Sequence, residues 1–378
     1  MTSFDAIVVG AGMVGAACAE ALSRGGMRVC IVERDAVGSG ATAAGMGHLV
    51  VMDDNAAELA LTRYSLALWN ALVERDPAPH EFSRCGTLWI AADDEELAAA
   101  CAKQATLQAN GIDCELLDAG ALYAHEPRLR PGLAGGLRVP GDAIAYPPKS
   151  ARHLVDTAIA RGARLVAGEV RSVDDGGITL ASGERIGAGM VVVANGLASA
   201  ALLPELPIRP KKGHLLITDR YPGFIRHQLV ELGYIKSAHA SDGDSVAFNL
   251  QPRPTGQILI GSSRQFDTTD RAAEPAMVQR MLAHAVSFVP ELASLQAIRC
   301  WTGFRAASPD GLPLVGPHPA RDGVWLATGH EGLGITTSLS SAALLAAQVF
   351  GSAPAIPVEP YLPARFAGLH EHVRHPSR

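Results

Sequence analysis

Three glycines near the start of the chain stand where a nucleotide phosphate needs bare backbone. Gly10, Gly12 and Gly15 follow an apolar run and precede a stretch of small residues that predicts a helix. Gly10 permits a tight turn, Gly12 lets a pyrophosphate approach the N–H groups at the helix N-terminus, and Gly15 lets the helix pack against the strand. Glu33 follows the next apolar run, where a carboxylate accepts hydrogen bonds from ribose hydroxyls. An ordinary glycine-rich turn is the alternative, and the placement favours bound NAD or FAD.

A second set of glycines, Gly329, Gly332 and Gly334, precedes the last long helix-like stretch. Such a loop offers free backbone N–H groups at the positive end of a helix dipole. A flavin needs donors of this kind, because negative charge develops at its N1 and C2 carbonyl edge on reduction. A glycine-rich loop without a ligand is the alternative. Since a simple nicotinamide site has no use for a second loop, the two sets together favour FAD.

Arg305 lies in the segment between these glycines and Gly303, with apolar neighbours and no acidic residue before Asp310. An arginine fork matches a substrate carboxylate in two places and stays charged, so it orients an α-amino acid with its α C–H over the flavin N5. An arginine that caps backbone carbonyls is the alternative. We expect Arg305 to bind the substrate.

Two further residues are candidates for the same cavity. Arg264 ends an expected strand and either faces the cavity or forms a surface salt bridge. His48 follows Gly45 to Gly47 and either lies near the flavin ring or is structural. Weaker candidates, each with a packing or capping alternative, are His330, Asn249, Gln251 and Tyr234, and Cys300 is interpreted as a buried thiol rather than a covalent flavin anchor.

The pattern of apolar residues predicts two kinds of structure. A parallel β-α-β arrangement is expected from the strand-like runs 4–9, 28–32, 164–166 and 190–194 and the helix-like runs 13–23, 55–75, 93–110 and 150–161. Alternating strands with Pro and Gly between them are expected from 209 to 263, including 212–218, 233–237, 245–250 and 257–261, followed by a helix at 276–288. We therefore expect an antiparallel sheet inserted into a dinucleotide-binding fold.

Composition excludes several classes of protein. The net charge is −6 and the basic residues form no run, which argues against nucleic acid. The six cysteines contain no C-x-x-C pair, so no metal site is expected, and they are interpreted as buried thiols of a reduced compartment. The run 334–349 is too short and polar to span a membrane, and no signal peptide precedes the first strand. A cytoplasmic enzyme without a transmembrane segment is expected.

Seven motifs appear in an order that resembles the D-amino-acid oxidase and glycine oxidase family of FAD-dependent oxidoreductases. They are Gly10 to Gly15 with Glu33, residues 41–46, 193–196, 209–213, Gly303 to Arg305 with 309–313, 329–334, and 363–366. The resemblance covers residues 5–366. It implies an α/β fold, with a Rossmann-type FAD-binding domain of the glutathione-reductase type and an inserted antiparallel-sheet substrate domain of the D-amino-acid oxidase type. We expect the first at 1–80, 141–205 and 301–378, and the second at 81–140 and 206–300.

The resemblance also assigns roles to residues. Arg305 matches the arginine that binds the substrate carboxylate, and hydride then passes from the α-carbon to flavin N5 without a strong general base. The covalent-flavin cysteine of the sarcosine oxidase branch does not align with Cys300, which implies noncovalent FAD. The expected cofactor contacts are Gly10, Gly12, Met13, Val14, Gly15, Glu33, Arg34, Ala41, Thr42, Gly45, Met46, Gly47, Val170, Ala194, Asn195, Gly196, Gly303, Gly329, Gly332, Leu333, Gly334, Ile335 and Thr336.

The substrate class follows from longer stretches. Residues 45–48, 211–214 and 261–266 look most like the flavin subunit of bacterial D-hydroxyproline dehydrogenases, with cyanide synthase and opine or proline dehydrogenase subunits next. We expect oxidation of a D-configured cyclic amino acid such as cis-4-hydroxy-D-proline, with Arg305, Arg264 and His48 in the site. The tyrosine of the glycine oxidase sheet aligns with Asn249, which changes the pocket.

Several alternatives stay open. They are an oxygen-using glycine, sarcosine or D-amino acid oxidase, a flavin-bearing electron-transfer subunit of a larger dehydrogenase, and an NAD-dependent dehydrogenase. Homo-oligomers and partner subunits that carry electrons are both compatible with the sequence.

Overall fold

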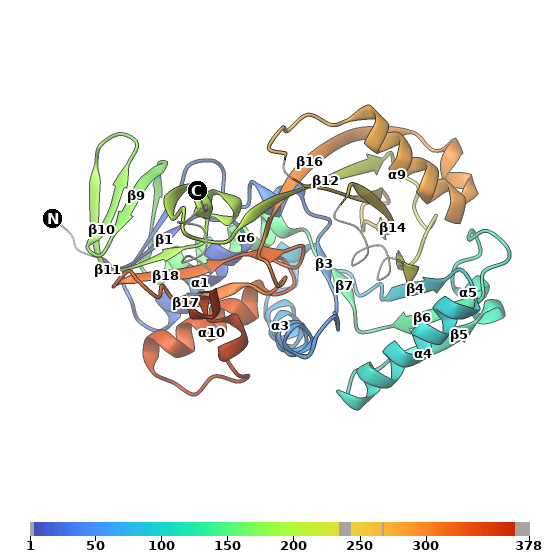
Figure 1. Cartoon of the computed structure of the whole chain (residues 1–378), viewed down its shortest axis with the longest axis horizontal. Helices are drawn as coiled ribbons and strands as arrows, with labels where there is room; N and C mark the ends of the chain where they lie inside the picture. Colours follow the sequence, from blue (N-terminus) through green and yellow to red (C-terminus); the bar gives the residue numbers. More distant parts are fainter. Residues whose placement is uncertain (1–3, 234–242, 267, 367–378) are drawn as a thin grey trace, which may run out of the picture.

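The computed structural model describes residues 4–233, 243–266 and 268–366, which form two lobes around two large sheets (Figure 1). The first sheet has the strand order β17-β18-β11-β1-β2-β8, and the antiparallel strands β10 and β9 extend from β11. The strands from β18 to β8 are mutually parallel, whereas β17 is antiparallel to β18. The bounds are β1 (Phe4–Val9), β2 (Val29–Glu33), β8 (Arg164–Ala167), β9 (Val170–Asp174), β10 (Gly177–Leu180), β11 (Arg185–Val193), β17 (Leu314–Pro317) and β18 (Val324–Thr328).

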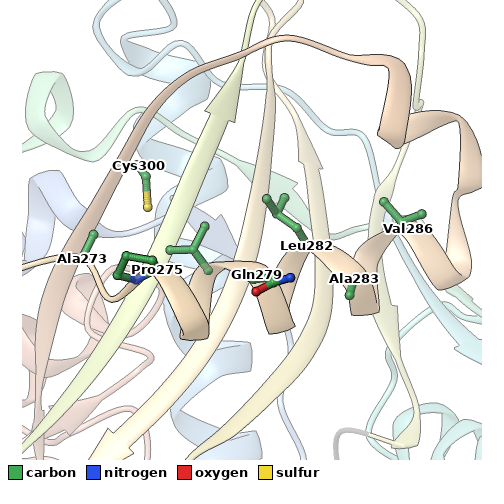
Figure 2. A pocket seen from close by; sticks show the side chains of 8 residues that line it. Ala273, Pro275, Gln279, Leu282, Ala283, Val286 and Cys300 are labelled. Carbon is green, nitrogen blue, oxygen red and sulfur yellow. The ribbon is translucent and has the colours of Figure 1, made fainter.

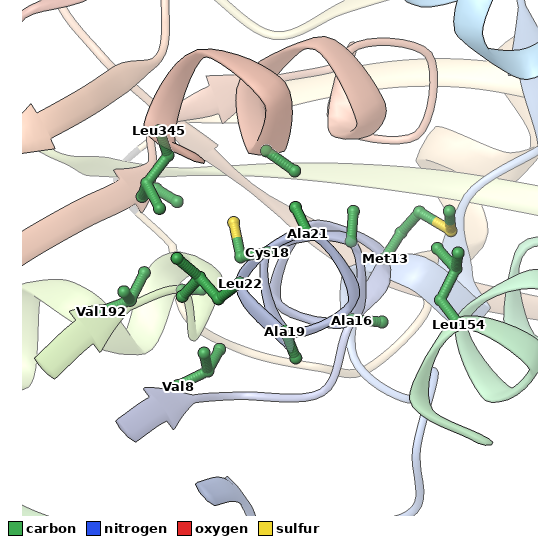
Figure 3. Close-up of a cluster of buried hydrophobic side chains, with 14 of the residues drawn as sticks. Val8, Met13, Ala16, Cys18, Ala19, Ala21, Leu22, Leu154, Val192 and Leu345 are labelled. Atoms are coloured by element: carbon green, nitrogen blue, oxygen red, sulfur yellow. The ribbon is translucent and has the colours of Figure 1, made fainter. Parts of the chain in front are cut away.

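Both faces of this sheet are covered, which explains the unbroken apolar runs of its central strands. Val8 and Val192 pack under α1, whereas Ile7 and Val191 belong to a second core on the opposite face. Small residues let α1 lie close to the strands, and Figure 3 shows it end-on with Leu345 on its other side. The helices of this lobe are α1 (Met13–Arg24), α3 (Ala56–Arg75), α6 (Pro147–Ala160), α7 (Ser199–Leu202) and α10 (Ser338–Phe350).

The second sheet has the strand order β19-β16-β12-β15-β14-β13-β4-β6-β5. Its neighbouring strands are antiparallel except for the pair β13 and β4. The bounds are β4 (Thr87–Ala91), β5 (Glu115–Asp118), β6 (Gly135–Val139), β12 (Arg209–Thr218), β13 (Gln228–Glu231), β14 (Ser245–Pro252), β15 (Ile258–Phe266), β16 (Ala297–Ala307) and β19 (His330–Glu331), with helices α4 (Asp94–Ala109), α5 (Ala119–His125) and α9 (Pro275–Phe288).

The two faces of this second sheet have different neighbours. One face packs on α9 through Met281, Ala285 and Phe288. The opposite face carries Leu215 and Leu259, which pack with Met46 of the first lobe. Short elements join the lobes: α2 (Ala41–Ala44), β3 (His48–Leu49) and β7 (Ala143–Ile144). We call this second face the inner face, because it lies against the parallel-sheet lobe.

The expected fold class is confirmed, while some expectations change or lie outside the described residues. The division into two sets of residue ranges stays a prediction. Tyr234 and most of the strand expected at 233–237 lie outside the described residues. The expectation that all cysteines are buried is wrong, because Cys101 is exposed and Cys85 and Cys300 are half-buried. Cys101 lies on the outer side of α4, where it contacts no apolar core.

Candidate functional site

The turn between β1 and α1 has the geometry that the first glycines predict. Gly10 has a φ of 101°, and a Cβ there would lie 2.8 Å from the carbonyl oxygen of Ala194. A Cβ on Gly15 would lie 2.0 Å from the carbonyl oxygen of Gly10. The helix begins after Gly12 with no side-chain cap from that residue and no acidic residue in its first turn. Met13 N–H donates to Thr42 Oγ1 at 2.9 Å, so this helix N-terminus suits a phosphate.

Glu33 lies at the end of β2 beside this turn. Its Oε2 accepts from Ala11 N–H at 2.7 Å and its Oε1 accepts from Asp35 N–H at 2.9 Å, which fixes the carboxylate at the mouth of the turn. Arg34 is exposed and forms ion pairs with Asp35 and Glu169. Val170 begins β9, next to Glu169.

The loop after β11 approaches the same turn. Ala194 contacts Gly10 closely, as described above, and Ser199 Oγ donates to Asn195 Oδ1 at 2.9 Å. The carbonyl of Gly196 accepts from Thr328 Oγ1 at 3.2 Å. Gly196 has a φ of 59°, a left-handed conformation that glycine adopts without strain. The carboxyl ends of β1, β2 and β11 therefore meet at one edge, where ligands of such sheets bind.

Residues 41–48 lie between the two lobes. Trp301 Nε1 of β16 donates to the carbonyl of Ala44 at 3.2 Å. A Cβ on Gly303 would lie 2.5 Å from the Cβ of Ala44, so only glycine lets β16 approach α2 this closely. Thr336 Oγ1 donates to the carbonyl of His48 at 2.8 Å. The first small-residue segment, β16 and the loop before α10 thus converge.

The loop 329–336 is anchored from below by α3. Trp69 Nε1 and Ser65 Oγ both donate to the carbonyl of Thr336, at 3.2 and 2.5 Å. Gly329 has a φ of 75°. His330 is buried, its Nε2 lies 2.9 Å from Ser341 Oγ, and burial lowers its pKa to about 3. His330 is therefore neutral and bonded to α10, which fits the packing alternative for this residue.

Arg305 extends from β16 across the inner face. Its Nη1 donates to the carbonyl of Ser263 at 3.1 Å. A Cβ on Gly213 would lie 3.1 Å from Nη2, and a Cβ on Gly332 would lie 3.7 Å from Nε, so the side chain passes between two glycines. Within the described residues this is the one hydrogen bond of the guanidinium, so N–H donors are left for a carboxylate.

Glu331 lies beside Arg305 and carries the opposite charge. Its Oε1 accepts from Lys211 Nζ at 2.5 Å, and its Oε2 accepts from the N–H of Gly332. Burial opposes ionisation of Glu331, but the charges of Arg305, Lys211 and Arg264 outweigh it and hold the pKa of Glu331 below its ordinary value. Arg264 and Arg305 therefore both lie within electrostatic range of the Glu331 carboxylate.

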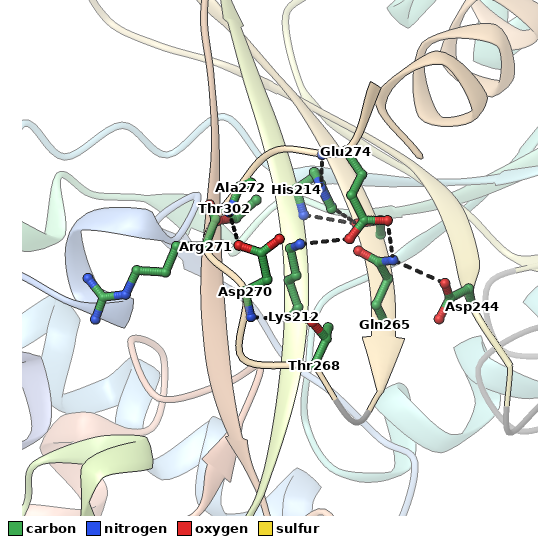
Figure 4. Close-up of polar contacts among 11 residues, drawn as sticks. Lys212, His214, Asp244, Gln265, Thr268, Asp270, Arg271, Ala272, Glu274 and Thr302 are labelled. Carbon is green, nitrogen blue, oxygen red and sulfur yellow. Dashed lines mark hydrogen bonds and ion pairs between the residues drawn. The ribbon is translucent and has the colours of Figure 1, made fainter. Parts of the chain in front are cut away.

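A polar network behind Arg305 ties β12 to β15 and to the segment before α9 (Figure 4). The buried Lys212 Nζ forms an ion pair with Glu274 at 2.8 Å, and Gln265 Nε2 donates to the same carboxylate at 2.9 Å. His214 Nδ1 lies 2.9 Å from Ser263 Oγ, and His214 Nε2 accepts from the N–H of Glu274 at 3.0 Å. Ser263, whose carbonyl holds Arg305, is therefore fixed from behind.

His48 faces a group of polar side chains on the inner face. Burial lowers the pKa of His48 to about 4, and the charge of Arg253 acts in the same direction. The amides of Gln228 and Asn249 favour the protonated ring and raise the pKa of His48 in part, which places both amides near the imidazole. His48 Nε2 lies 3.3 Å from Met46 Sδ. The imidazole of His48 is therefore uncharged at neutral pH.

A shallow apolar hollow of about 580 Å³ lies elsewhere, between α9 and β16 (Figure 2). It is lined by Ala273, Pro275, Val278, Gln279, Leu282, Ala283, Val286 and Cys300. None of these described side chains is charged, so the hollow has no partner for a carboxylate. It is separate from the convergence of the glycine loops.

Sequence reasoning missed three residues of the site. Glu331 and Lys211 were seen only as parts of motifs, and their contact depends on the edge strand β19 pairing with β16. Gln228 carried no signal, because a buried amide on a short strand has no characteristic pattern. The charge of Glu331 inside the second glycine loop is the signal that could have identified it.

Two features of the described residues bear on other functions. No cluster of three or more His, Cys, Asp or Glu residues suited to a metal ion occurs in residues 4–233, 243–266 and 268–366. Within those ranges, none of the helices combines the length and apolar character that crossing a membrane requires.

Comparisons with known proteins agree with this geometry. The family model for FAD dependent oxidoreductase matches residues 5–348. Glycine oxidase of Pseudomonas aeruginosa is 30% identical, over 95% of this chain and 98% of its own length. D-amino acid dehydrogenase 2 of Ralstonia nicotianae is 33% identical, over 81% of this chain and 75% of its own length.

A solved structure shows the same architecture. Glycine oxidase from Geobacillus kaustophilus superposes with a TM-score of 0.85 at 27% identity, covering 97% of this chain and 99% of that one. The uncapped helix N-terminus, the fixed Glu33 and the second glycine loop fit FAD, as the family requires. The chain belongs to the D-amino-acid oxidase family of FAD-dependent oxidoreductases.

Proposed function

We propose that this enzyme oxidises the C–N bond of a small amino or imino acid to the imine. The most similar relatives named above act on glycine or D-amino acids, which supports this class of substrate. We further propose that the preferred substrate is a D-configured cyclic one such as cis-4-hydroxy-D-proline. The stretches 45–48, 211–214 and 261–266 support this choice.

The observation that carries the proposal is the position of Arg305. Its guanidinium passes between Gly213 and Gly332, on the inner face, next to the loop 329–336 and the segment 41–48. A carboxylate bound there would lie between the two glycine-rich elements. Glu331 neutralises the charge of Lys211, so positive charge does not build up around Arg305.

The chain positions the substrate, whereas bound FAD supplies the redox chemistry by accepting a hydride from the α-carbon. Arg305 holds the substrate carboxylate in two places, which fixes the α C–H in one direction. Met46, Leu215 and Leu259 exclude water from the space beside it. The amine nitrogen reacts as the neutral base, after losing one proton to water. The α C–H bond breaks with its electron pair leaving as hydride, and the nitrogen lone pair forms the C=N bond of an iminium. The iminium then loses a proton to water and gives the imine.

We propose that FAD is bound without a covalent link. Gly10, Gly12, Gly15 and Glu33 hold its nucleotide half, and the loop 329–336 with residues 41–47 holds its flavin half. This assigns residues 1–80, 141–205 and 301–378 to the cofactor and 81–140 and 206–300 to the substrate. Cys300 supports the absence of a covalent link, since it lies in the apolar hollow beside α9 rather than at the glycine loops.

A second candidate function is a flavin-bearing subunit of a larger dehydrogenase. Hydrogen cyanide synthase subunit HcnC of Pseudomonas aeruginosa is 27% identical over 96% of this chain, and its name places it in an assembly. The two candidates differ in the electron acceptor rather than in the oxidative step. A cytoplasmic location stays a prediction.

The test is an assay of product and acceptor with the purified flavoprotein. We expect cis-4-hydroxy-D-proline to yield a cyclic imine, detected by mass spectrometry, with an artificial dye as acceptor. The same reaction in air, followed with an oxygen electrode, separates an oxidase from a dehydrogenase. If neither cyclic D-imino acids nor glycine, sarcosine or linear D-amino acids give an imine with any acceptor, the proposed function is wrong.

A further inference from the structure

The inner face has an apolar centre with a charged side chain at one end and a polar group at the other. Met46, Leu215 and Leu259 form the centre, and Gly261 leaves room beside Met46, whose Sδ would lie 3.3 Å from a Cβ at that position. Arg305 is the charged end. The polar end consists of Gln228 on β13, Asn249 on β14 and His48 on β3. We call these three residues the polar end.

The register of the sheet places two of these residues on one face. The antiparallel ladder pairs Val230 with Asn249, and Gln228 stands two residues before Val230. Because side chains alternate along a strand, Gln228 and Asn249 project from the same face. Asn249 also pairs with Gly261 on β15, so the polar end borders the position without a side chain.

Two amide oxygens at the polar end have no hydrogen-bond partner among the residues that the structure describes. Gln228 is buried, and its Nε2 donates to the carbonyl of Ala143 at 3.0 Å and to Thr87 Oγ1 at 3.4 Å. These bonds fix the amide so that Oε1 is left over. Among the described residues, neither Gln228 Oε1 nor Asn249 Oδ1 has a hydrogen-bond partner, and both atoms are buried. Buried acceptors of this kind are destabilising until a donor reaches them.

The chemistry of the polar end selects the kind of group that binds there. Two amide oxygens accept hydrogen bonds, and the neutral imidazole of His48 offers one donor or one acceptor on each ring nitrogen. The two amide oxygens accept hydrogen bonds, so a group that donates one suits them and a carboxylate does not. A hydroxyl group donates one hydrogen bond and accepts another, so it satisfies an amide oxygen and the imidazole together.

The spacing between the two ends suits one small ring. The guanidinium of Arg305 binds the carbonyl of Ser263, and Asn249 pairs with Gly261, two residues earlier on the same strand. Two residues along a strand span about 7 Å, and the adjacent strand lies about 4.8 Å away. A carboxylate at position 2 and a hydroxyl at position 4 of a five-membered ring bridge such a gap with one hydrogen bond at each end.

We propose that Gln228 and Asn249, with His48, form a subsite for the hydroxyl group of a hydroxylated cyclic imino acid. This subsite distinguishes the hydroxylated substrate from the plain ring. The inference rests on the proposed function, because it concerns the same site and the same reaction. The inference adds the identity of the residues that bind the hydroxyl group.

The experiment follows anaerobic reduction of the bound flavin by stopped flow, with cis-4-hydroxy-D-proline and with D-proline as the two probes. For each, the dependence on concentration gives a dissociation constant and a limiting rate. The variants are Asn249→Leu, which removes an oxygen that has no partner among the described residues, and Gln228→Leu. The matched control is Gln279→Leu, the same change at an exposed position on α9.

We expect wild type and Gln279→Leu to prefer the hydroxylated probe by at least about tenfold in the ratio of rate to dissociation constant. In Asn249→Leu that preference falls to near one, mainly through the dissociation constant. Gln228→Leu also loses the two hydrogen bonds to Thr87 and Ala143. If Gln228→Leu does not fold, the result for Asn249→Leu alone tests the subsite.

Two results would overturn the subsite while leaving the proposed function standing. One is that wild type has the same ratio of rate to dissociation constant for the two probes. The other is that Asn249→Leu prefers the hydroxylated probe as strongly as wild type does. If neither probe reduces the flavin, although dithionite does, the preferred cyclic substrate of the proposed function is wrong and the subsite is wrong with it.

Discussion

The two lobes present different surfaces to the space between them. The parallel-sheet lobe presents backbone: glycines at positions 10, 12, 15, 329 and 334 and the small residues of 41–47, where added Cβ atoms meet backbone or side chains at close distance. The mixed-sheet lobe presents long polar side chains, among them Arg305 and Gln228, on an otherwise apolar face. The first surface suits a ligand that is the same throughout a family, and the second suits a ligand that differs between members.

The largest effect is expected from a side chain added to the glycine surface of the parallel-sheet lobe. Gly15→Val puts side-chain atoms onto the carbonyl oxygen of Gly10, which a Cβ alone would approach to 2.0 Å. We expect the protein to lose its flavin, measured as absorbance near 450 nm after gel filtration. Gly141→Ala is the matched control, since a Cβ there meets nothing within 4 Å. Full flavin content in Gly15→Val would show that the turn does not bind the cofactor.

The second-largest effect distinguishes substrate binding by the mixed-sheet lobe from cofactor binding by the parallel-sheet lobe. Arg305→Met removes the guanidinium and keeps an unbranched chain between Gly213 and Gly332. We expect flavin content to stay unchanged, while the dissociation constant of the substrate rises by about 100-fold, as for loss of one partner of a buried charge pair. Anaerobic spectral titration measures both quantities. An unchanged dissociation constant would mean that Arg305 serves only to hold the carbonyl of Ser263.

His48, between the two lobes, makes the stability of the protein depend on pH. The pKa of His48 is about 4 in the folded protein and near its ordinary value when unfolded, so the unfolded state binds a proton first. Stability from this residue is complete above pH 6.5 and falls as the pH drops toward 4, by roughly 3 kcal/mol at most. His48→Asn cannot titrate, so we expect it to lose less stability than wild type across that range in urea unfolding. Parallel losses in both proteins would contradict the buried neutral imidazole.

The smallest effect concerns Glu331, whose pKa is lowered in the folded protein. A lowered carboxyl pKa stabilises the fold above the ordinary pKa, and that contribution disappears as the pH falls through the folded value. Glu331→Gln should therefore be less stable than wild type at pH 7, by about 1 kcal/mol, and the difference should vanish in acid. Thermal unfolding at several pH values measures this. A gap that persists in acid would point to a shape effect rather than to charge.

The same contrast explains what the sequence reveals. The positions of Gly10, Gly12 and Gly15 follow from local backbone geometry, which a short motif specifies completely. Arg305 was singled out because it lies between two glycine-rich segments with no acidic residue before Asp310, and its role in binding substrate stays a prediction. The fold class was predictable from the change between two kinds of apolar pattern.

What the sequence does not reveal depends on contacts between distant segments. Glu331 reaches Lys211 only because β19 pairs with β16, and this pairing joins residues far apart in the chain. The exposed Cys101 shows the same limit, since a thiol on a helix is equally compatible with either side. Gln228 is buried by the meeting of β13 with β4, a parallel pair that no alternating pattern predicts.

The most direct test of the account is the visible spectrum of the purified protein during an anaerobic titration with cis-4-hydroxy-D-proline, D-proline, glycine, sarcosine and the L-enantiomers. We predict a yellow protein whose flavin absorbance is bleached by a cyclic D-imino acid and restored by an oxidant. A yellow protein that dithionite bleaches but none of these compounds does would contradict a substrate site at Arg305. A colourless protein that binds no FAD on reconstitution would contradict the cofactor assignment.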